Sequence, residues 1–384
     1  MSKKFKIFAT LGAYLCVFSY AACSCVCHAC NNEINRQFHL NNTQVGILFM
    51  LVFLGFIPTS LITGALSDKK GKLPFICLGV VLMAIGSILF ITTKNYYVAL
   101  LSMFLMGAGG GCSEANATCF MGDIFEGTQR IKMMNLVQTF YGLGAFLAPF
   151  LAGAFLNYFN SYNLAFVIVC GFCLLSLIFS LISYFQKEEK PVRVEKVKVP
   201  WNVILKDCFI LWVVGSLVLY CGSEIGFSEW VAVYFEKYLN VTPYTAAQSV
   251  SFIWLGIAIG SYLASLVAKK LTPEQIIKIS LVCLIVSHFV FRSSNVIVAF
   301  VGVFFVGLFL GPIFPTVIAL GSSKYKEHSG AVGSILFCCA NLGCAFFPAL
   351  MGYFVDLTSI ATAMWFVVIL AFVNLGLYFV KIKN

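Results

Sequence analysis

Charged residues are scarce in this chain. Asp, Glu, Lys and Arg make up 10% of its 384 residues, and only 15 residues are acidic. Soluble domains carry about 25% charged and roughly 45–50% apolar residues, whereas 60% of this sequence is hydrophobic. A water-soluble protein of this length cannot bury so much apolar surface. The shortage of charge therefore excludes an ordinary soluble protein and indicates that the chain lies in lipid.

Motifs typical of other classes of membrane protein are also missing. The sequence has no G-x-x-x-x-G-K-[ST] phosphate loop and no repeated filter sequence, which argues against an ATP-driven pump and against a channel. No closely spaced nucleophile and base stand out, so we expect neither an enzyme nor a cofactor. The longest polar stretch, residues 186–206, is too short for the soluble domain that a membrane receptor would carry.

Long apolar runs fill the rest of the chain. Between polar breaks they extend for about 20 residues, which is enough for a helix to cross about 30 Å of hydrocarbon. Backbone groups in lipid must be satisfied within the segment, which favours helices. The sequence thus predicts an all-α membrane protein with twelve transmembrane helices. We expect spans at residues 7–30, 44–66, 74–93, 96–120, 134–157, 162–185, 207–235, 245–268, 275–292, 295–321, 329–353 and 359–380.

The net charge of +10 is distributed in a way that indicates topology. If the amino terminus is cytoplasmic, all Lys and Arg residues except Arg36, Lys94, Lys237 and Arg292 fall on cytoplasmic segments. This asymmetry follows the positive-inside rule. We therefore expect both termini in the cytoplasm, a multi-pass protein of the plasma membrane (the inner membrane in a bacterium), and no nucleic-acid partner.

The two halves of the chain resemble each other at an offset near 200 residues. The charge-rich stretch 186–206 divides the chain and is expected to be a cytoplasmic linker between bundles at 1–185 and 207–384. Matching residues occur in the same order in both halves. They are Leu54, Gly55 and Ser60 with Leu255, Gly256 and Ser261; Phe104, Gly107 and Gly111 with Phe304, Gly307 and Gly311; and Leu143, Gly144, Pro149, Leu151 and Gly153 with Leu342, Gly343, Pro348, Leu350 and Gly352. The pattern predicts two six-helix bundles related by a pseudo-twofold axis.

The loop after the second expected span reads G-A-L-S-D-K-K-G-K at residues 64–72. It resembles the signature G-x-L-x-D-[RK]-x-G-[RK] of the major facilitator superfamily. We interpret it as a conformational latch formed by Gly64, Asp68, Lys69, Gly71 and Lys72. Gly64 is expected to permit close helix approach and Gly71 a tight turn. The second half has Lys269 in place of the aspartate, so the latch is one-sided.

Four further segments resemble the fucose–galactose–glucose symporter branch of that superfamily, in particular its fucose permease-like members. They are G-A-G-G-G-C-S-E at 107–114, M-N-L-V-Q-T-F-Y-G-L-G-A at 134–145, Y-C-G-S-E-I-G-F-S-E-W at 220–230 and G-P-I-F-P-T at 311–316. The resemblance implies the major facilitator fold and secondary transport by alternating access. It places Glu114 at the branch's fourth-span carboxylate and Gln138 at its fifth-span amide. The sequence departs from the branch at Tyr141, where those proteins have Asn, and at His28, which aligns with their first-span acid.

Ionisable residues within lipid depth are candidates for function because a charge there costs about 2.5–3.5 kcal/mol on insertion scales. Glu114, Glu224 and His28 are therefore our candidates for proton coupling. Glu229 is expected nearer the outer end of its span, in contact with water.

Neutral polar and aromatic residues in the spans suit a polyol. Asn116, Thr118 and Gln138 offer hydrogen bonds to hydroxyl groups, and Tyr141 and Trp230 offer ring faces for the C–H face of a sugar. Each also fits a purely structural role, because polar residues hold membrane helices together.

Most of the 16 cysteines lie in apolar runs, where they are expected to remain reduced. On a helix, Cys23, Cys27 and Cys30 fall on one face, beside His28, and Cys25 points away. Thiolates with a histidine suit copper or zinc. Apolar burial keeps thiols protonated, however, and structural zinc sites place cysteine pairs on turns, so we predict no metal site.

These observations together predict uptake of a sugar or similar small polyol coupled to protons, or to sodium, by a monomer in the bilayer. The alternatives are efflux or exchange of another small solute such as a drug, an amino acid or a nucleoside. Metal-ion transport through the cysteine-rich first span is the least favoured alternative.

Overall fold

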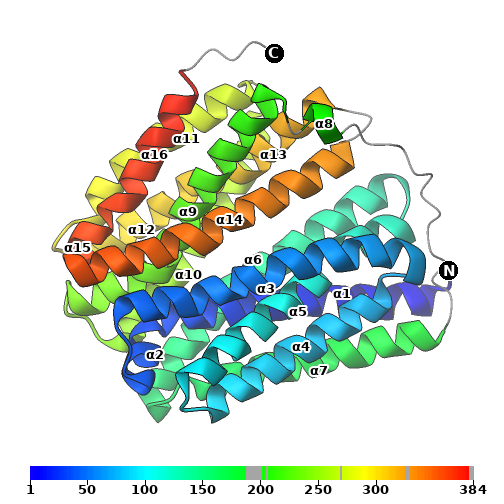
Figure 1. Ribbon diagram of the computed structural model, residues 1–384, viewed down its shortest axis with the longest axis horizontal. Helices are drawn as coiled ribbons and strands as arrows, with labels where there is room; N and C mark the ends of the chain where they lie inside the picture. Colours follow the sequence, from blue (N-terminus) through cyan, green and yellow to red (C-terminus); the bar gives the residue numbers. More distant parts are fainter. Residues whose placement is uncertain (187–200, 205, 269, 326–328, 380–384) are drawn as a thin grey trace. The chain divides into compact units, whose positions relative to one another are not determined.

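The computed structural model describes residues 1–186, 201–204, 206–268, 270–325 and 329–379 (Figure 1). Secondary structure in these residues is helical, without a strand. Twelve helical segments are long and apolar enough to cross a membrane, as the sequence predicts. The linker predicted at 186–206 falls largely on residues 187–200, which lie outside the described ranges.

The chain forms two compact units. One contains residues 1–40 and 47–196, and the other residues 41–46 and 197–384. The first unit is built mainly from seven helices: α1 (Lys3–Ala29), α2 (Asn31–Phe38), α3 (Asn42–Lys70), α4 (Leu73–Thr92), α5 (Tyr96–Ile124), α6 (Gly127–Phe159) and α7 (Asn163–Phe185). Residues 41–46, at the start of α3, cluster with the second unit, which the sequence analysis did not anticipate.

The second unit contains nine helices: α8 (Trp201–Ile204), α9 (Cys208–Lys237), α10 (Pro243–Val267), α11 (Pro273–Phe291), α12 (Val296–Leu310), α13 (Ile313–Lys324), α14 (Ser329–Leu357), α15 (Ile360–Ala363) and α16 (Trp365–Leu377). The tenth span, Val296–Lys324, comprises α12 and α13, which are separated at Gly311 and Pro312. Proline lacks the backbone N–H that would continue the helix, so a break here is expected.

The same helices pair in both units. In the first, α1 packs on α6 and α7, and α4 packs on α5 and α7. In the second, the corresponding α9 packs on α14 and α16, and α11 packs on α12 and α16. The order of pairing confirms two six-helix bundles with internal symmetry.

Glycines make the closest helix contacts at matching positions of the two units. A Cβ atom on Gly107 of α5 would overlap the carbonyl oxygen of Val52, and one on Gly307 of α12 would overlap that of Ile253. Gly111 against Phe56 and Gly311 against Ile257 repeat the contact one turn later. Small residues of this kind let membrane helices approach backbone to backbone. The repeated glycines predicted from the sequence therefore encode the same packing twice.

Polar side chains fix several helix ends. Ser2 accepts a hydrogen bond from the Phe5 N–H at 3.2 Å at the start of α1. Thr272 and Gln275 form a capping box at the start of α11. At the start of α3, the Asp356 carboxylate accepts hydrogen bonds from the backbone N–H groups of Asn42 and Thr43, at 3.0 and 2.7 Å. These caps satisfy backbone donors that the helix itself leaves unpaired.

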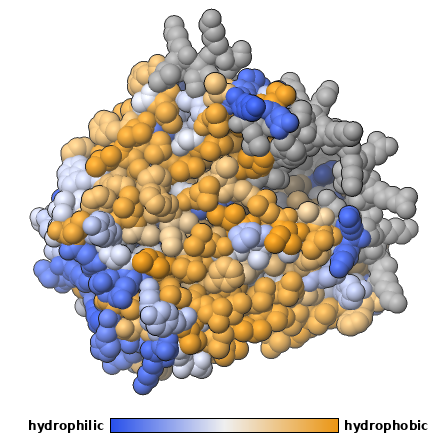
Figure 2. Space-filling view, viewed as in Figure 1, coloured by the Kyte–Doolittle hydropathy of each residue, from blue (hydrophilic) through white to orange (hydrophobic). Residues whose placement is uncertain are grey.

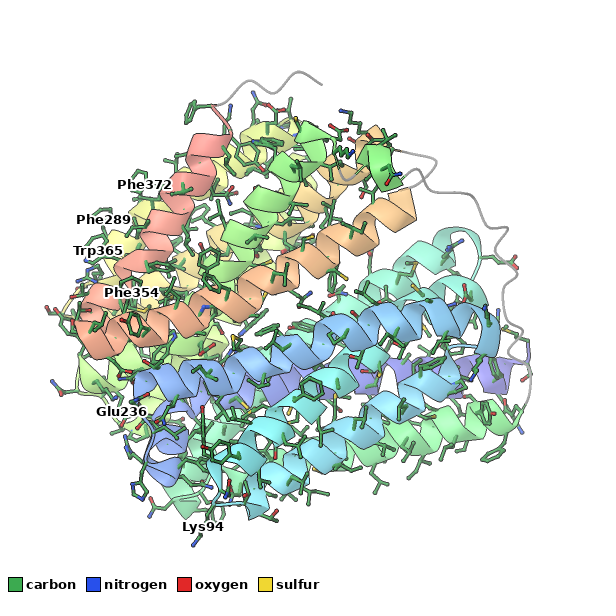
Figure 3. All side chains as sticks on the ribbon, in the orientation of Figure 1. Lys94, Glu236, Phe289, Phe354, Trp365 and Phe372 are labelled. Atoms are coloured by element: carbon green, nitrogen blue, oxygen red, sulfur yellow. The ribbon has the colours of Figure 1, made fainter. Side chains whose placement is uncertain are left out.

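Apolar side chains are exposed along the helices of each unit (Figure 2). Leu61 and Ile62 of α3, Leu174 of α7, and Val286 and Phe289 of α11 all have more than half of their side-chain area exposed. In Figure 3, Phe289 of α11 and Phe372 of α16 lie on the outer side of their helices, and Lys94 lies at the turn that joins α4 to α5. Apolar faces with charges at the turns are what a lipid solvent requires.

Candidate functional site

Glu114 lies in the middle of α5 and is 7% exposed. Within the ranges that the structure describes, no group donates a hydrogen bond to its carboxylate; the bond that involves this residue runs from the Thr118 hydroxyl to the Glu114 backbone oxygen. A carboxyl group held in an apolar bundle without a fixed donor is unusual, because an uncompensated charge is costly there.

The glycine-rich stretch before Glu114 brings three helices against α5. Gly107 and Gly111 lie against the α3 backbone, Gly109 lies against Gly79 of α4, and Gly110 lies against the ring of Tyr20 in α1. No side chain larger than hydrogen fits at these positions without a shift of the neighbouring backbone or ring. The motif therefore acts in packing, and it sets the position of Glu114 one turn further along α5.

Aromatic rings surround the same level of the first unit. The Tyr20 ring stacks on Phe56 of α3 with a centroid distance of 5.5 Å and meets Tyr141 of α6 edge-on at 6.3 Å. Tyr141 is half-buried, so part of its surface is open. Tyr20 was not among the site residues predicted from the sequence. It could have been found as a tyrosine hydroxyl in the middle of an apolar span.

The side-chain amide of Asn116 donates its hydrogen bonds within the protein. Its Nδ2 donates to the Thr63 hydroxyl at 3.2 Å and to the Cys112 carbonyl at 2.8 Å, and the residue is buried. Thr118 is half-buried, and Gln138 is exposed on α6. Asn116 thus joins α5 to α3, whereas Thr118 and Gln138 keep surface that a ligand can reach.

His28 lies in the last turn of α1 and is buried. Its ring meets the Phe49 ring of α3 edge-on, with centroids 5.9 Å apart. His28 therefore packs against an aromatic ring near the end of α1, at the position that aligns with the first-span acid of the symporter branch.

In the second unit, Glu224 of α9 is half-buried and accepts a 2.6 Å hydrogen bond from the hydroxyl of Tyr220, one turn earlier. Gly222 and Gly226, on either side, lie against Phe347 and Met351 of α14. Glu224 therefore has a fixed donor on its own helix, which distinguishes it from Glu114.

Glu229 and Trp230 are buried more deeply than expected. Glu229 is 1% exposed, so the expectation that water reaches it is wrong in this structure. Trp230 is fully buried, and its indole N–H donates to the Pro348 carbonyl at 3.1 Å. The ring of Trp230 packs α9 against α14 and offers no open face to a ligand here.

The motif at residues 64–72, predicted as a loop, lies largely in the last turns of α3, and only Gly71 and Lys72 form the turn that follows. Gly71 has a φ of 85°, which is the left-handed conformation expected of a tight turn. Gly64 has no described atom within 4 Å of its Cβ position, so the close helix approach expected at this residue stays a prediction. Lys72 is buried, and its Nζ lies 2.6 Å from the Asp123 carboxylate at the end of α5. Lys69 is exposed, and the side chain of Asp68 and all of Lys269 lie outside what the structure describes.

Among the described residues, no three His, Cys, Asp or Glu side chains converge to hold a metal ion. Cys23, Cys25, Cys27, Cys30 and His28 are all buried, and none of these cysteines forms a disulfide.

Comparison with known proteins agrees with this architecture. The sequence profile of the Major Facilitator Superfamily matches residues 13–335. The glucose/mannose transporter GlcP of Bacillus subtilis is 25% identical over 359 residues, which cover 91% of this chain and 88% of that protein. A glucose/galactose transporter of Brucella abortus is 22% identical over 375 residues, which cover 93% of this chain and 90% of that protein.

Solved structures show the same fold. A bacterial homologue of the human lysosomal transporter Spinster, in an inward-facing and occupied conformation, superposes with a TM-score of 0.80 at 14% identity and covers 99% of this chain and 97% of that one. The transporter FucP in its outward conformation superposes with a TM-score of 0.65 at 18% identity, covering 98% of this chain and 99% of that one.

Proposed function

Because the chain belongs to the Major Facilitator Superfamily, we propose that it takes up a sugar or similar small polyol together with protons, by alternating access. Two relatives of nearly the same length carry the names of glucose/mannose and glucose/galactose transporters, which supports a hexose as the first solute to test. The observation that carries the coupling is Glu114, a buried carboxyl group in the middle of a membrane span with no fixed hydrogen-bond donor among the described residues.

Glu114 is suited to carry a proton because the free-energy cost of ionising its carboxyl group depends on whether water reaches it. In apolar surroundings the neutral form is favoured, and access of water favours the carboxylate. A transporter that alternates between a closed and an open state around such a group therefore binds a proton in one state and releases it in the other. Thr118, Gln138 and Tyr141 provide partly open polar and aromatic surface for the solute on α5 and α6.

Replacement of Glu114 tests the coupling. In proteoliposomes with a pH gradient, Glu114→Gln is expected to lose concentrative uptake of glucose, mannose or galactose, because the amide cannot carry a proton. Exchange of labelled for unlabelled sugar needs no net proton movement and should persist at a measurable rate.

Glu126→Gln provides the matched control. Glu126 is exposed at the start of α6 and makes no side-chain capping bond, so this variant should accumulate sugar as the unmodified chain does. Concentrative uptake by Glu114→Gln at the unmodified rate would remove Glu114 from the mechanism. Uptake of another solute class, with no sugar transported, would overturn the substrate proposal.

We propose the motif at residues 64–72, the end of α3 and the turn after it, as the latch of the transport cycle. The positive φ of Gly71 and the 2.6 Å Lys72–Asp123 ion pair support this role, because they hold the turn against the end of α5. Lys72→Met should lower the rate of uptake several-fold while substrate affinity stays within about twofold, as measured by initial rates over a range of sugar concentrations. Lys94→Met, at the α4–α5 turn, is the control; an equal loss in both variants would contradict the latch.

A further inference from the structure

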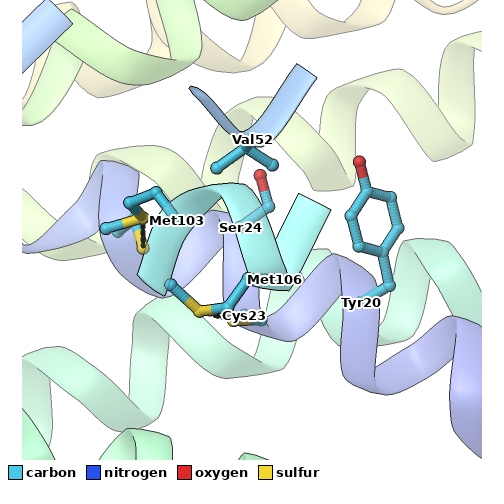
Figure 4. A pocket seen from close by; sticks show the side chains of 7 residues that line it. Tyr20, Cys23, Ser24, Val52, Met103 and Met106 are labelled. Atoms are coloured by element: carbon cyan, nitrogen blue, oxygen red, sulfur yellow. Dashed lines mark hydrogen bonds between the residues drawn. The ribbon is translucent and has the colours of Figure 1, made fainter. Parts of the chain in front are cut away.

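A small pocket in the first unit is lined largely by sulfur-containing side chains. Its lining residues are Tyr20, Cys23, Ser24, Cys27, Val52, Met103 and Met106 (Figure 4). They come from α1, α3 and α5, and all lie within this one unit. The pocket combines two thiols and two thioethers, while its oxygen-bearing groups are the hydroxyls of Tyr20 and Ser24.

The four sulfur atoms pair across two helices. The Cys23 thiol lies 2.9 Å from the Met106 sulfur, and the Cys27 thiol lies 4.0 Å from the Met103 sulfur. Cys23 and Cys27 are one turn apart on α1, as Met103 and Met106 are on α5, so the two pairs form successive contacts between the helices. The Ser87 hydroxyl of α4 approaches both Cys23 and Met106, at 3.6 Å in each case.

We propose that this cluster binds one monovalent, thiophilic metal ion, Cu(I), with Ag(I) as its chemical analogue. Thiolate and thioether ligands select Cu(I) over the harder divalent ions, which prefer nitrogen and oxygen. Half of the sulfur comes from methionine, which is a ligand for soft metals. The four sulfur ligands lie on α1 and α5, and metal binding there does not depend on which solute the protein carries.

Charge balance favours the same ion. Burial keeps the free thiol protonated, so it is the ion that displaces the proton: binding forms a Cu–S bond at Cys23 and releases the thiol proton to solvent, while Met103 and Met106 donate lone pairs and remain neutral. One positive ion and one thiolate leave the site with no net charge, whereas a divalent ion with one thiolate would leave a positive charge among buried side chains, which is costly. The Ser87 hydroxyl is placed to donate to the thiolate.

The side chains can adjust to metal–sulfur bonds of about 2.3 Å. Methionine has three rotatable bonds and a polarisable sulfur, so its thioether shifts with little strain. Cys23, Cys27, Met103 and Met106 are each no more than 2% exposed, which shields a bound Cu(I) from oxygen and water.

The test is a Cu(I) titration of the purified full chain under nitrogen, in competition with a chromophoric chelator. The exposed cysteines Cys119 and Cys208 are first replaced by Ser to remove surface thiols. We expect one tightly bound Cu(I) per chain. The pair Met103→Leu and Met106→Leu preserves side-chain volume and should weaken this binding at least tenfold.

The matched control replaces Cys25 with Ser and Met121 with Leu, a buried cysteine and a buried methionine on the same two helices that do not line the pocket. It should bind Cu(I) as the parent does. Equal affinity in the parent and in the Met103/Met106 variant, or an equal loss in the control, would overturn the proposal.

A second measurement needs no mutation. In protein grown with selenomethionine, X-ray absorption at the copper edge reports selenium in the first coordination shell directly. A Cu–Se shell supports ligation by Met103 and Met106, and a shell of sulfur alone, or of nitrogen and oxygen, would overturn it.

Discussion

Asp207 lies at the start of α9, where its carboxylate accepts hydrogen bonds from three groups. The Phe209 N–H is 2.9 Å away, the Tyr325 hydroxyl 2.7 Å, and the Lys324 Nζ lies 2.9 Å from one oxygen and 3.1 Å from the other. Partial burial acts to raise the pKa of Asp207, but the hydrogen bonds and the lysine charge outweigh it and lower the pKa below its ordinary value. One residue therefore joins the beginning of α9 to the end of α13.

The stability of the second unit should consequently depend on pH through Asp207. Because the folded pKa is lower than the unfolded pKa of about 3.9, the carboxylate stabilises the fold above that value. This contribution is lost as the pH falls through the folded pKa. Asp207→Asn should lower the unfolding midpoint at about pH 7, and the difference from the parent should shrink as the pH falls below about 3.9, the unfolded pKa.

Thermal unfolding of both proteins in detergent, followed across this pH range, measures the effect. Glu126→Gln serves as the control, since Glu126 is exposed and makes no capping bond. A difference between Asp207→Asn and the parent that stays constant with pH would show that the charge of Asp207 does not stabilise the fold.

At the scale of the helix, α5 depends on glycine. Gly107 lies against the Val52 carbonyl and Gly109 against that of Gly79, so α5 contacts α3 and α4 on two of its faces within three residues. A methyl group at either position would push the helices apart and would weaken the packing around Glu114.

Gly107→Ala should therefore reduce stability although alanine is the better helix former. Overpacking of a tight contact costs about 1–3 kcal/mol, which exceeds the gain of about 1 kcal/mol in helix propensity. Gly171→Ala on α7 is the matched substitution, because no described atom lies within 4 Å of its Cβ position and the residue is exposed. Unfolding midpoints should fall for Gly107→Ala and stay level or rise for Gly171→Ala. A rise in both would contradict the packing role.

The break between α12 and α13 shows the limit of reading helices from hydropathy. The sequence analysis treated residues 295–321 as one span, and the structure places one span at Val296–Lys324, interrupted at Gly311 and Pro312. The interruption was visible as a Gly-Pro pair. The short helix α2 was not predicted, because its eight residues are mostly polar and lie outside any apolar run.

At the scale of the whole molecule, the sequence predicted the membrane spans and the duplication of the fold. The apolar runs predicted the twelve spans because the thickness of the lipid sets the same minimum length for each of them. The paired glycines at 107 and 307, and at 111 and 311, predicted the duplication because each must admit a neighbouring backbone.

The environment of individual site residues was harder to predict, because it depends on which face of a helix meets which neighbour. Glu229 and Trp230 lie close to Glu224 in sequence, yet both are buried while Glu224 is half-open. The Cys23–Met106 contact joins residues 83 positions apart. The sequence of either span alone does not predict that these two side chains are in contact.

The duplicated glycine contacts have a consequence for biosynthesis. The glycines that let α5 contact the backbone of α3 have counterparts that let α12 contact the backbone of α10. Each helix of the first pair therefore has a contact surface similar to one in the second pair. Domains generally fold as units with the amino-terminal part first, so we expect α3 and α5 to pack on each other before α10 and α12 leave the ribosome. Conditions that delay assembly of the first half should therefore yield chains with exchanged helix partners.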